Sequence, residues 1–415
     1  MASGEVIVVG AGVSGLCCAL WLQEHGVRPL VLEASDGVGG RARTDEHEGF
    51  LLDRGFQVLL TAYPEVRRVL NYDALDLRAF YPGAKVHAEG EFFRVADPFR
   101  RPVGGLVTLL TPVGSLADKL RVGRLRLEVM RDSVEETLRA PDESTAWFLA
   151  SRGFSPRMVE RFFRPFFGGV FLEDELSTSA RLFRFLYKMF GEGKIALPNR
   201  GMGQIPVQLA RRLQDGGIRL GALVREVRDG GVVLESGEEL RANAVVVATE
   251  APVAGRLLGR QIPAAAHGTT CLYFSAPEPP EREPILLLEG EGRGPVNNVA
   301  VPSQVAPGYA PKGEALIAAT VLGVPRAADA ELEQAVRTQL TGWFGTAVRG
   351  WRHLRTYRIP YALPAQPPGA LEPVEKPVHV RGRIFTCGDH RGTASLNGAM
   401  LAGRRAAEAV LQAIG

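Results

Sequence analysis

Apolar runs of strand length occur near both ends of the chain, and each leads into an apolar helix pattern. Residues 5–9 have the pattern of a buried strand, and apolar side chains at helical spacing follow as far as Leu22. Residues 383–387 form a similar short strand, and a helix pattern runs from Ser395 almost to the last residue. Strands that alternate with helices in this way predict an α/β fold.

Mixed patterns fill the middle of the chain. Residues 84–95 have a strand pattern, and helical spacing dominates residues 115–190. A strand pair is expected at 218–227 and 244–249. Further along, strands are expected at 270–275, 285–289 and 315–322, and a helix at 330–344. The pattern in the middle of the chain therefore predicts both strands and helices, in an α+β arrangement.

Composition and charge exclude several classes of protein. The 415 residues are 46% hydrophobic and 23% charged, which is enough for two globular domains. The longest apolar runs, such as 104–110, fall well short of the roughly 20 residues that a membrane-spanning helix needs. A net charge of +3 predicts no nucleic-acid surface. Residues 1–4 lead directly into a strand without a signal-peptide pattern, which predicts a cytoplasmic protein.

Cysteine usage offers no alternative chemical centre. The four cysteines, at 17, 18, 271 and 387, have no metal-ligand spacing and are expected to be buried thiols. No Ser-His-Asp arrangement and no metal constellation is evident in the sequence. We therefore expect no metal site.

The first expected strand runs straight into a G-x-G-x-x-G turn that opens a helix. Gly10 permits the tight turn, Gly12 allows a pyrophosphate to approach the backbone, and Gly15 allows the helix to pack against the strand. The second expected strand ends at Glu33, a carboxylate placed to accept hydrogen bonds from ribose hydroxyls. Together these features predict a Rossmann-like dinucleotide site that disfavours NADP, whose 2′-phosphate the carboxylate would repel.

A second glycine-rich segment, Gly37-Val38-Gly39-Gly40-Arg41-Ala42-Arg43-Thr44, follows directly. Gly39 and Gly40 again allow close approach to a ligand, and Arg41 and Arg43 supply positive charge for phosphate. With Leu52-Asp53-Arg54-Gly55, this segment resembles the flavin amine oxidase superfamily, which includes phytoene desaturases and protoporphyrinogen oxidases. The resemblance implies non-covalently bound FAD, with the segment lying along its pyrophosphate and flavin.

The C-terminal segment carries the same resemblance. It implies that Gly388 and Asp389 bind the ribityl chain and pyrophosphate, and that the helix start at Leu396, Asn397 and Ala399 faces flavin N1 and O2. In the strand pair at 218–249, Val224 matches the position whose backbone meets the adenine. An ordinary strand pair without a ligand is the alternative interpretation of that stretch.

These elements imply two discontinuous domains. The FAD-binding domain is expected to comprise residues 1–75, 200–250 and 375–415. The substrate domain is expected to comprise residues 76–199 and 251–374, with a mixed sheet and a helical cap, as the resemblance implies.

The resemblance also implies an FAD-dependent oxidoreductase that dehydrogenates a hydrophobic substrate, such as an isoprenoid. No second G-x-G-x-x-G follows a strand, so the electrons are expected to pass to oxygen or a quinone. Two alternatives remain open: a flavin amine or amino-acid oxidase that produces hydrogen peroxide, and an FAD-dependent non-redox isomerase. The first is disfavoured because residues 269–275 and 285–289 lack the lysine that many amine oxidases of the superfamily place near the flavin.

Candidate substrate residues lie in the two insertions. Tyr361, Tyr357 and Arg358 are predicted to line the substrate face, the tyrosines by packing or hydrogen bonding and Arg358 by holding an anion or a substrate oxygen. A strand with alternating exposed arginines is the alternative.

Two further segments allow two interpretations each. Phe163, Phe166 and Phe167 would line an apolar tunnel or form the core of the cap. Residues 99–110 would rest on a membrane surface or form a solvated loop before a helix.

Overall fold

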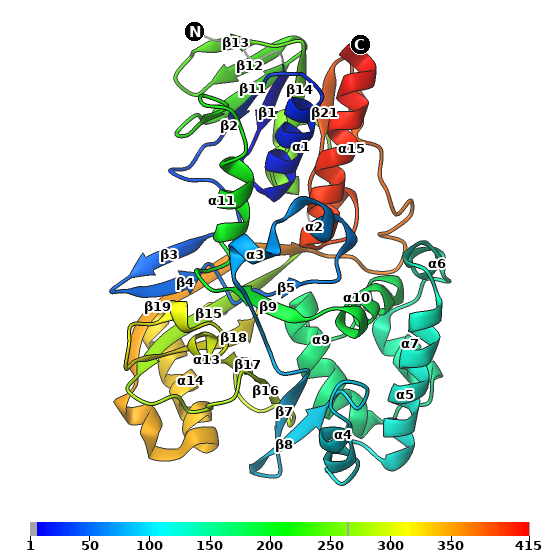
Figure 1. Cartoon of the computed structure of the whole chain (residues 1–415), viewed down its shortest axis with the longest axis vertical. Helices are drawn as coiled ribbons and strands as arrows, with labels where there is room; N and C mark the ends of the chain where they lie inside the picture. Colours follow the sequence, from blue (N-terminus) through cyan, green and yellow to red (C-terminus); the bar gives the residue numbers. More distant parts are fainter. Residues whose placement is uncertain (1–5, 264, 415) are drawn as a thin grey trace.

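The computed structural model describes residues 6–263 and 265–414. Its elements form two halves along the long axis of the molecule (Figure 1). The half that contains both chain ends is built on a six-stranded sheet, and the other half is built on a seven-stranded sheet and a group of helices. The two sheets draw on separate stretches of the chain, and we propose that each is the centre of one of the two domains expected from the sequence.

The six-stranded sheet contains the strands expected at both ends of the chain. Its order is β10 (Ile218–Arg219), β2 (Pro29–Leu32), β1 (Val6–Val9), β14 (Ala244–Val247), β21 (Ile384–Thr386) and β20 (His379–Arg381). The first five strands are parallel, and β20 pairs antiparallel to β21. The central strands β2, β1 and β14 contain only apolar residues because both faces of the sheet are covered there. Residue 5, which was expected to begin the first strand, lies outside the described residues.

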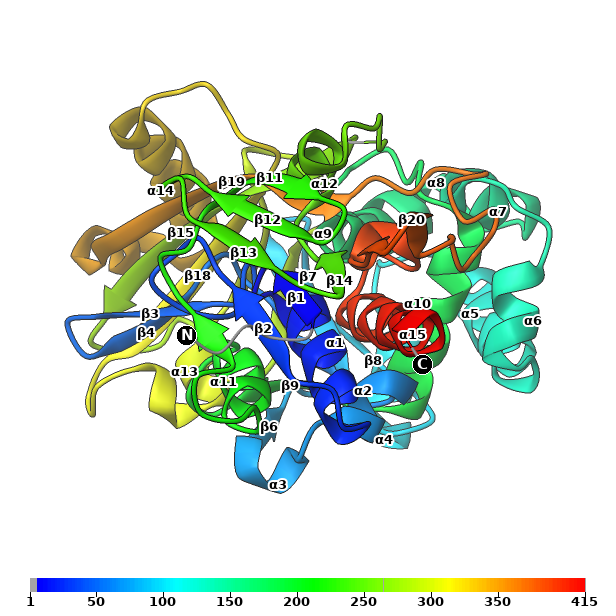
Figure 2. The same ribbon diagram turned by 90° about the horizontal axis from the view of Figure 1, so that it is seen from above.

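Two helices cover one face of this sheet and a small meander covers the other (Figure 2). Helices α1 (Val13–Glu24) and α15 (Leu396–Ile414) pack closely: a Cβ added at Gly403 would lie 2.2 Å from the carbonyl oxygen of Ser14. The meander consists of β11 (Val224–Arg228), β12 (Gly231–Leu234) and β13 (Glu239–Arg241). The prediction of a single strand at 218–227 is therefore wrong. The chain leaves the six-stranded sheet after β10 and turns at Gly221, which has a φ of +64°.

The seven-stranded sheet is mixed, as expected. Its order is β19 (Arg352–Pro364), β15 (Ala266–Ala276), β18 (Ala315–Leu322), β17 (Val296–Ala300), β16 (Leu286–Glu289), β7 (Gly83–Ala88) and β8 (Glu91–Ala96). All neighbouring pairs are antiparallel except β16 and β7. Helix α14 (Asp329–Phe344) contributes Leu332, Val336 and Leu340 to the apolar core on one side of the sheet.

Helices of the first insertion lie on the flank opposite α14 (Figure 2). They are α4 (Pro102–Leu109), α5 (Leu116–Arg131), α6 (Val134–Arg139), α7 (Thr145–Ser151), α8 (Pro156–Met158), the π-helical η1 (Val159–Phe163), α9 (Arg164–Phe171) and α10 (Ala180–Glu192). The solvated loop considered for residues 99–110 is wrong for 102–109, which form α4. Pro102 begins that helix at a position where a missing N–H costs nothing.

Smaller elements lie between the two halves or on their outer sides. They are β3 (Thr44–His47), β4 (Phe50–Asp53), β5 (Leu59–Leu60), α2 (Pro64–Val69), α3 (Tyr72–Leu75), β6 (Leu77–Ala79), β9 (Ile195–Pro198), α11 (Gln204–Ala210), α12 (Ala251–Leu258), α13 (Pro302–Val305), η2 (Pro307–Tyr309), η3 (Gly345–Gly350) and η4 (Asp389–Arg391). Among the described residues, no helix has the length and apolar character needed to cross a membrane.

Candidate functional site

The turn between β1 and α1 has the geometry that its glycines predict. Gly10 has a φ of +105°, and its N–H donates to the carbonyl of Leu32 at 2.8 Å. A Cβ at Gly15 would lie 2.1 Å from the carbonyl oxygen of Gly10, so only glycine allows the helix to start this close to the strand. A Cβ at Gly12 would meet nothing within 4 Å. The backbone at Gly12 is therefore open to a ligand.

The second glycine-rich segment lies against the first. Gly39 donates its N–H to the carbonyl of Ala11 at 2.8 Å and forms a parallel bridge with Gly12. A Cβ at Gly40 would lie 3.5 Å from the Cα of Gly12. Two segments that are separate in the sequence thus form one continuous stretch of nearly bare backbone, which suits a pyrophosphate.

Glu33 stands at the end of β2, next to this backbone. One carboxylate oxygen accepts the N–H of Ala11 at 2.8 Å, and the other accepts both the N–H and the hydroxyl of Ser35, at 2.9 and 2.8 Å. Each oxygen can accept more than one hydrogen bond, so the orientation is fixed while capacity for ribose hydroxyls remains. The backbone carbonyl of Glu33 accepts the N–H of Ala222, which brings the start of β11, with the buried Val224, to the same place.

Arg43 lies over the loop that follows Glu33. Its guanidinium pairs with Asp36 at 2.9 Å and donates to the Ser35 hydroxyl at 3.3 Å. Because Asp36 is highly exposed, this ion pair contributes little to stability. Arg43 can therefore exchange Asp36 for a phosphate at low cost.

Arg41 connects this region to the C-terminal segment. Its guanidinium pairs with Asp389 at 2.8 Å and donates to the carbonyl of Ala362 at 3.0 Å. Burial opposes the charge on Arg41, but Asp389 outweighs it and raises the pKa of the guanidinium. The other Asp389 oxygen is buried without a hydrogen-bond partner. Because buried acceptors are normally satisfied, this oxygen marks a position for a ligand donor. Gly388, which precedes it, has a φ of +143°.

His390 lies beside the same turn. Both ring nitrogens are buried without a partner, and burial lowers the pKa of the ring to about 4. The imidazole is therefore neutral near pH 7.

The start of α15 matches its predicted role only in part. Ser395 accepts the N–H of Gly398 at 3.0 Å, so the first turn of the helix lies next to the Asp389 turn with Leu396 and Ala399 in it. The side chain of Asn397 points elsewhere, because its carbonyl oxygen accepts the N–H of Glu65 at 2.9 Å. Asn397 therefore ties α15 to α2 through its side chain, and only its backbone is available to the cofactor site.

Tyr361 is the one predicted substrate residue that lies beside the cofactor segments. The guanidinium of Arg41 stands 5.5 Å from the centre of its ring, and its hydroxyl is buried without a partner. Burial, followed by the nearby Asp389 carboxylate, raises the pKa of that hydroxyl to about 12. At neutral pH Tyr361 is thus a hydrogen-bond donor whose hydroxyl has no acceptor among the described residues.

Tyr357 and Arg358 are engaged elsewhere. The hydroxyl of Tyr357 donates to Asp45 at 2.8 Å. The guanidinium of Arg358 donates to the Asp329 carboxylate through Nε at 2.9 Å and Nη2 at 2.8 Å, and also to two backbone carbonyls before α14. These contacts give Arg358 a structural role at the start of α14, and none of them supports the predicted contact with a substrate oxygen.

Asp53 forms a buried hydrogen-bond network that the sequence did not reveal. Its carboxylate accepts hydrogen bonds from the hydroxyls of Thr44, at 2.5 Å, and Tyr309, at 2.7 Å, and from the N–H of Met202, at 2.9 Å. Despite these donors, burial dominates and raises the pKa of Asp53 to about 6. The network joins β3, β4, η2 and the turn that precedes α11.

This raised pKa predicts a pH dependence of stability. The folded protein holds the Asp53 proton more tightly than the unfolded chain, so raising the pH from about 4 to about 6 lowers the free energy of unfolding, by up to about 3 kcal/mol for this group. Asp53→Asn should remove this pH dependence, because the amide does not titrate. The amide can still accept the N–H of Met202 and donate to the oxygen of Tyr309. Urea unfolding of both proteins across this pH range tests the prediction. Parallel pH profiles would contradict it.

A cavity of about 1540 Å³ lies between helices of the first insertion and the small elements α3, β6 and β9. Its apolar lining includes Phe80, Val113, Phe162, Phe166 and Phe190. This volume exceeds that of an ordinary small-molecule pocket, which is about 300–1,000 Å³. The cavity therefore accommodates a long or broad substrate.

The aromatic cluster divides into core and lining. Phe163 is fully buried and does not line the cavity, so it belongs to the core of the cap. Phe166 is partly buried, stacks on Phe162 at 5.6 Å and lines the cavity. Phe167 is almost fully buried but also contributes to the wall. The core interpretation is thus confirmed for Phe163, whereas Phe166 and Phe167 line a cavity and their place in a substrate tunnel stays a prediction.

An exposed apolar surface surrounds one end of the cavity. It is formed by α4 and its flanks, and its most exposed apolar side chains are Phe99, Val103, Leu106, Val107, Leu109 and Leu110. Three of these, Phe99, Leu106 and Leu109, also line the cavity. We call these six residues the α4 surface. An apolar surface of this kind marks an interaction site.

Comparisons with known proteins agree with this geometry. Residues 13–411 match the family model described as flavin-containing amine oxidoreductase. The chain is 26% identical over 390 residues to a coproporphyrinogen III oxidase from Propionibacterium freudenreichii subsp. freudenreichii, in a match that covers 75% of this chain and 71% of that protein. It is 28% identical over 298 residues to a phytoene dehydrogenase from Streptomyces griseus, covering 62% of this chain and 56% of that protein.

A similar fold is found in a candidate protoporphyrinogen oxidase from Exiguobacterium sp. 255-15. The structures align with a TM-score of 0.75 over 99% of each chain, at 18% sequence identity. This similarity confirms the predicted fold class, in which a Rossmann-like unit is joined to a mixed sheet with a helical cap.

Proposed function

Since this chain belongs to the family of flavin-containing amine oxidoreductases, we propose that it dehydrogenates a large, mainly apolar substrate in the cavity lined by Phe162, Phe166 and Phe190. The chain is an FAD-dependent oxidoreductase whose cofactor is bound non-covalently. The single observation that supports the substrate class is this cavity, whose volume and phenylalanine-rich wall match a large, mainly apolar molecule better than a small amine.

The residues described above fit FAD. The bare backbone around Gly12 and Gly40 suits the pyrophosphate, Glu33 suits a ribose, and the unpaired oxygen of Asp389 suits a hydroxyl donor of the ribityl chain. Bound there, FAD supplies an acceptor for a hydride from a substrate carbon. The protein excludes water and orients the substrate. The buried hydroxyl of Tyr361 is the candidate donor to a polar atom of the bound molecules.

A continuous series of contacts links the cavity to the cofactor segments. Phe80 lines the cavity and makes an edge contact with Phe56 at 6.2 Å. Phe56 follows Gly55, where an added Cβ would lie 2.9 Å from the side chain of Ile359 on β19. The wall of the cavity is therefore packed, through Phe56, close to β19, the strand that also carries Tyr361.

The charged lining favours a second candidate substrate class. Basic residues around the cavity outnumber acidic ones: Arg67, Arg100, Arg101, Lys119, Arg126 and Lys194 against Asp73, Asp76, Asp97 and Glu192. A porphyrinogen, which has an apolar skeleton with carboxylates at its periphery, would match this excess of basic residues. An isoprenoid would match the phenylalanines. The relatives named above include one of each kind.

Anaerobic mixing tests the proposal. The holoprotein should lose its oxidised flavin absorbance with phytoene or with coproporphyrinogen, and not with putrescine or benzylamine. Readmission of oxygen, or addition of a quinone, should restore the absorbance and identify the electron acceptor. Reduction by the amines alone would favour the amine oxidase alternative, and turnover without any bleaching would favour an isomerase.

We further propose that the α4 surface rests on a lipid bilayer. Three of its six side chains line the cavity, and the exposed Arg101 is next to them in the sequence. Apolar side chains flanked by basic ones are typical of monotopic membrane contact. A substrate dissolved in the bilayer could then enter the cavity without crossing water.

Vesicle binding tests this contact. The holoprotein should sediment with vesicles of phosphatidylcholine and phosphatidylglycerol, and the double variant Leu106→Ser/Leu110→Ser should bind at least about tenfold more weakly, since each leucine loses its apolar burial. Leu127→Ser, which removes an exposed leucine outside the α4 surface, is the matched control and should bind like the parent. Equal binding by the double variant would rule out this surface.

A further inference from the structure

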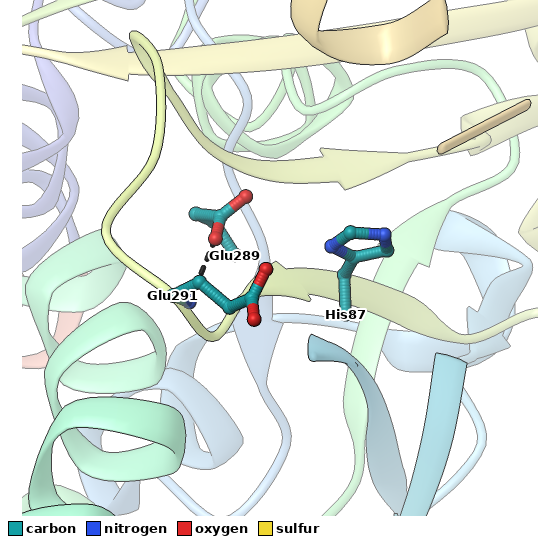
Figure 3. Close-up of side chains that lie close together, drawn as sticks. All are labelled: His87, Glu289 and Glu291. Carbon is teal, nitrogen blue, oxygen red and sulfur yellow. Dashed lines mark hydrogen bonds between the residues drawn. The ribbon is translucent and has the colours of Figure 1, made fainter. Parts of the chain in front are cut away.

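Three potential metal ligands meet at one end of the paired strands β7 and β16 of the seven-stranded sheet (Figure 3), and none of them lines the cavity. His87 lies on β7, and Glu289 is the last residue of the neighbouring strand β16, directly beside His87 in the parallel register. Side chains at paired positions of parallel strands point to the same face. Glu291 follows two residues later and returns its carboxylate toward them. One ligand atom from each of the three residues lies within 4.8 Å of the other two.

A close backbone approach makes this meeting possible. Gly290 donates its N–H to the carbonyl of His87 at 3.0 Å. A Cβ at Gly290 would lie 2.7 Å from that carbonyl oxygen and 2.5 Å from a methyl group of Val86. Glycine at this position therefore lets the chain turn tightly enough to place Glu291 over the end of β7.

His87 is the residue that points to a ligand. It is 91% buried, and neither ring nitrogen has a hydrogen-bond partner. Its ring is held between Trp343, stacked at 5.3 Å, and Phe92, in edge contact at 5.2 Å. A buried imidazole without a partner is costly, because at least one ring nitrogen loses its bond to water. An ion bound to that nitrogen would remove the cost.

The two carboxylates are already held in position. Glu289 accepts the N–H of Glu291 at 2.7 Å and the side-chain amide of Gln339, on α14, at 3.1 Å. Glu291 accepts the N–H of Glu89 at 3.0 Å, and its other oxygen lies 3.4 Å from the exposed guanidinium of Arg293. Donors of this kind orient metal ligands and leave lone pairs for the ion.

We propose that His87, Glu289 and Glu291 bind one Zn²⁺ ion. One imidazole nitrogen and two carboxylate oxygens form a donor set that suits zinc, whereas Ca²⁺ and Mg²⁺ prefer oxygen ligands alone. A modest movement of Glu291, which is on a loop, would bring the three ligand atoms to zinc-binding separation. The ion would tie β7, β16 and the loop after β16 together, and through Gln339 it would also hold α14.

Zinc titration of the holoprotein tests the site. Protein without a polyhistidine tag is treated with EDTA, desalted and titrated with ZnCl₂ by calorimetry, with bound metal counted by elemental analysis. We expect one zinc per chain, no comparable binding of Mg²⁺, and a higher melting temperature with zinc, because a ligand of the native state stabilises it.

The variant His87→Phe keeps an aromatic ring between Trp343 and Phe92 and should lose the bound zinc and the rise in melting temperature. Glu291→Gln, on the loop, should bind zinc at least about tenfold more weakly while folding normally. His47→Phe, which removes a histidine beside Glu48 outside this cluster, is the matched control and should still bind one zinc ion per chain. Zinc binding that is substoichiometric in the parent, or unchanged in both His87→Phe and Glu291→Gln, would overturn the proposal.

Discussion

Phe166→Asp should abolish turnover of an apolar substrate while leaving a soluble protein that contains FAD. The side chain lines a cavity large enough to hold water, so its carboxylate remains hydrated in the absence of substrate. An apolar substrate would have to displace that water, which costs about 3 kcal/mol or more and lowers the rate at least about hundredfold. Because the cofactor segments lie elsewhere in the chain, FAD content should be unchanged. Flavin absorbance measures the FAD content, the melting temperature measures stability, and anaerobic flavin reduction measures activity.

Two companion variants sharpen this test. Phe166→Leu preserves the apolar wall and should retain most of the activity. Phe163→Asp places the same charge in the closed core, where the residue has no exposed surface, and should unfold or aggregate the protein. If Phe166→Asp aggregated in the same way, or if it turned over substrate normally, the cavity would lose its role in the proposed function.

Glu33→Ala should weaken FAD binding about ten- to hundredfold, the equivalent of about 1.5–3 kcal/mol for charge-assisted hydrogen bonds to a ribose. The carboxylate is pre-oriented by Ala11 and Ser35, so no reorganisation is needed when the ribose binds. Fluorescence quenching of FAD titrated with the apoprotein gives the dissociation constant.

Ser35→Ala separates the two roles of this carboxylate. It removes the hydroxyl that holds Glu33 but leaves the charge and the N–H contacts, so its effect on FAD should be much smaller. An affinity in Glu33→Ala equal to that of the parent would mean that the carboxylate serves only the loop after β2.

Most of the fold and the first part of the cofactor site could be predicted from short-range patterns in the sequence. The turn at Gly10 and Gly15 depends on local backbone sterics, which a single sequence displays directly. The strand at 244–247 is an uninterrupted apolar run and the strand at 315–322 is apolar except for Thr320, and both were located within one or two residues. The segment 218–227 was misjudged because its break depends on a positive φ at Gly221, which the apolar pattern does not reveal.

Long-range contacts could not be predicted in the same way. The ion pair of Arg41 with Asp389 and the bonds of Arg358 around α14 depend on how distant segments pack. The helix at 102–109 was missed because its apolar side chains face outward and two adjacent glycines weaken its propensity. His87 and Glu291 are 204 positions apart, so no ligand spacing exists to detect.

The close packing of α1 against α15 has a consequence for biosynthesis. The first strand–turn–helix unit is synthesised long before α15, which covers its helix, and β14 gains its neighbour β21 only when residues 384–386 have also been made. The nascent chain must therefore hold the apolar faces of α1 and β14 exposed through most of translation. This protein is expected to depend on chaperones until β21 and α15 have been synthesised, and to acquire its cofactor only afterwards.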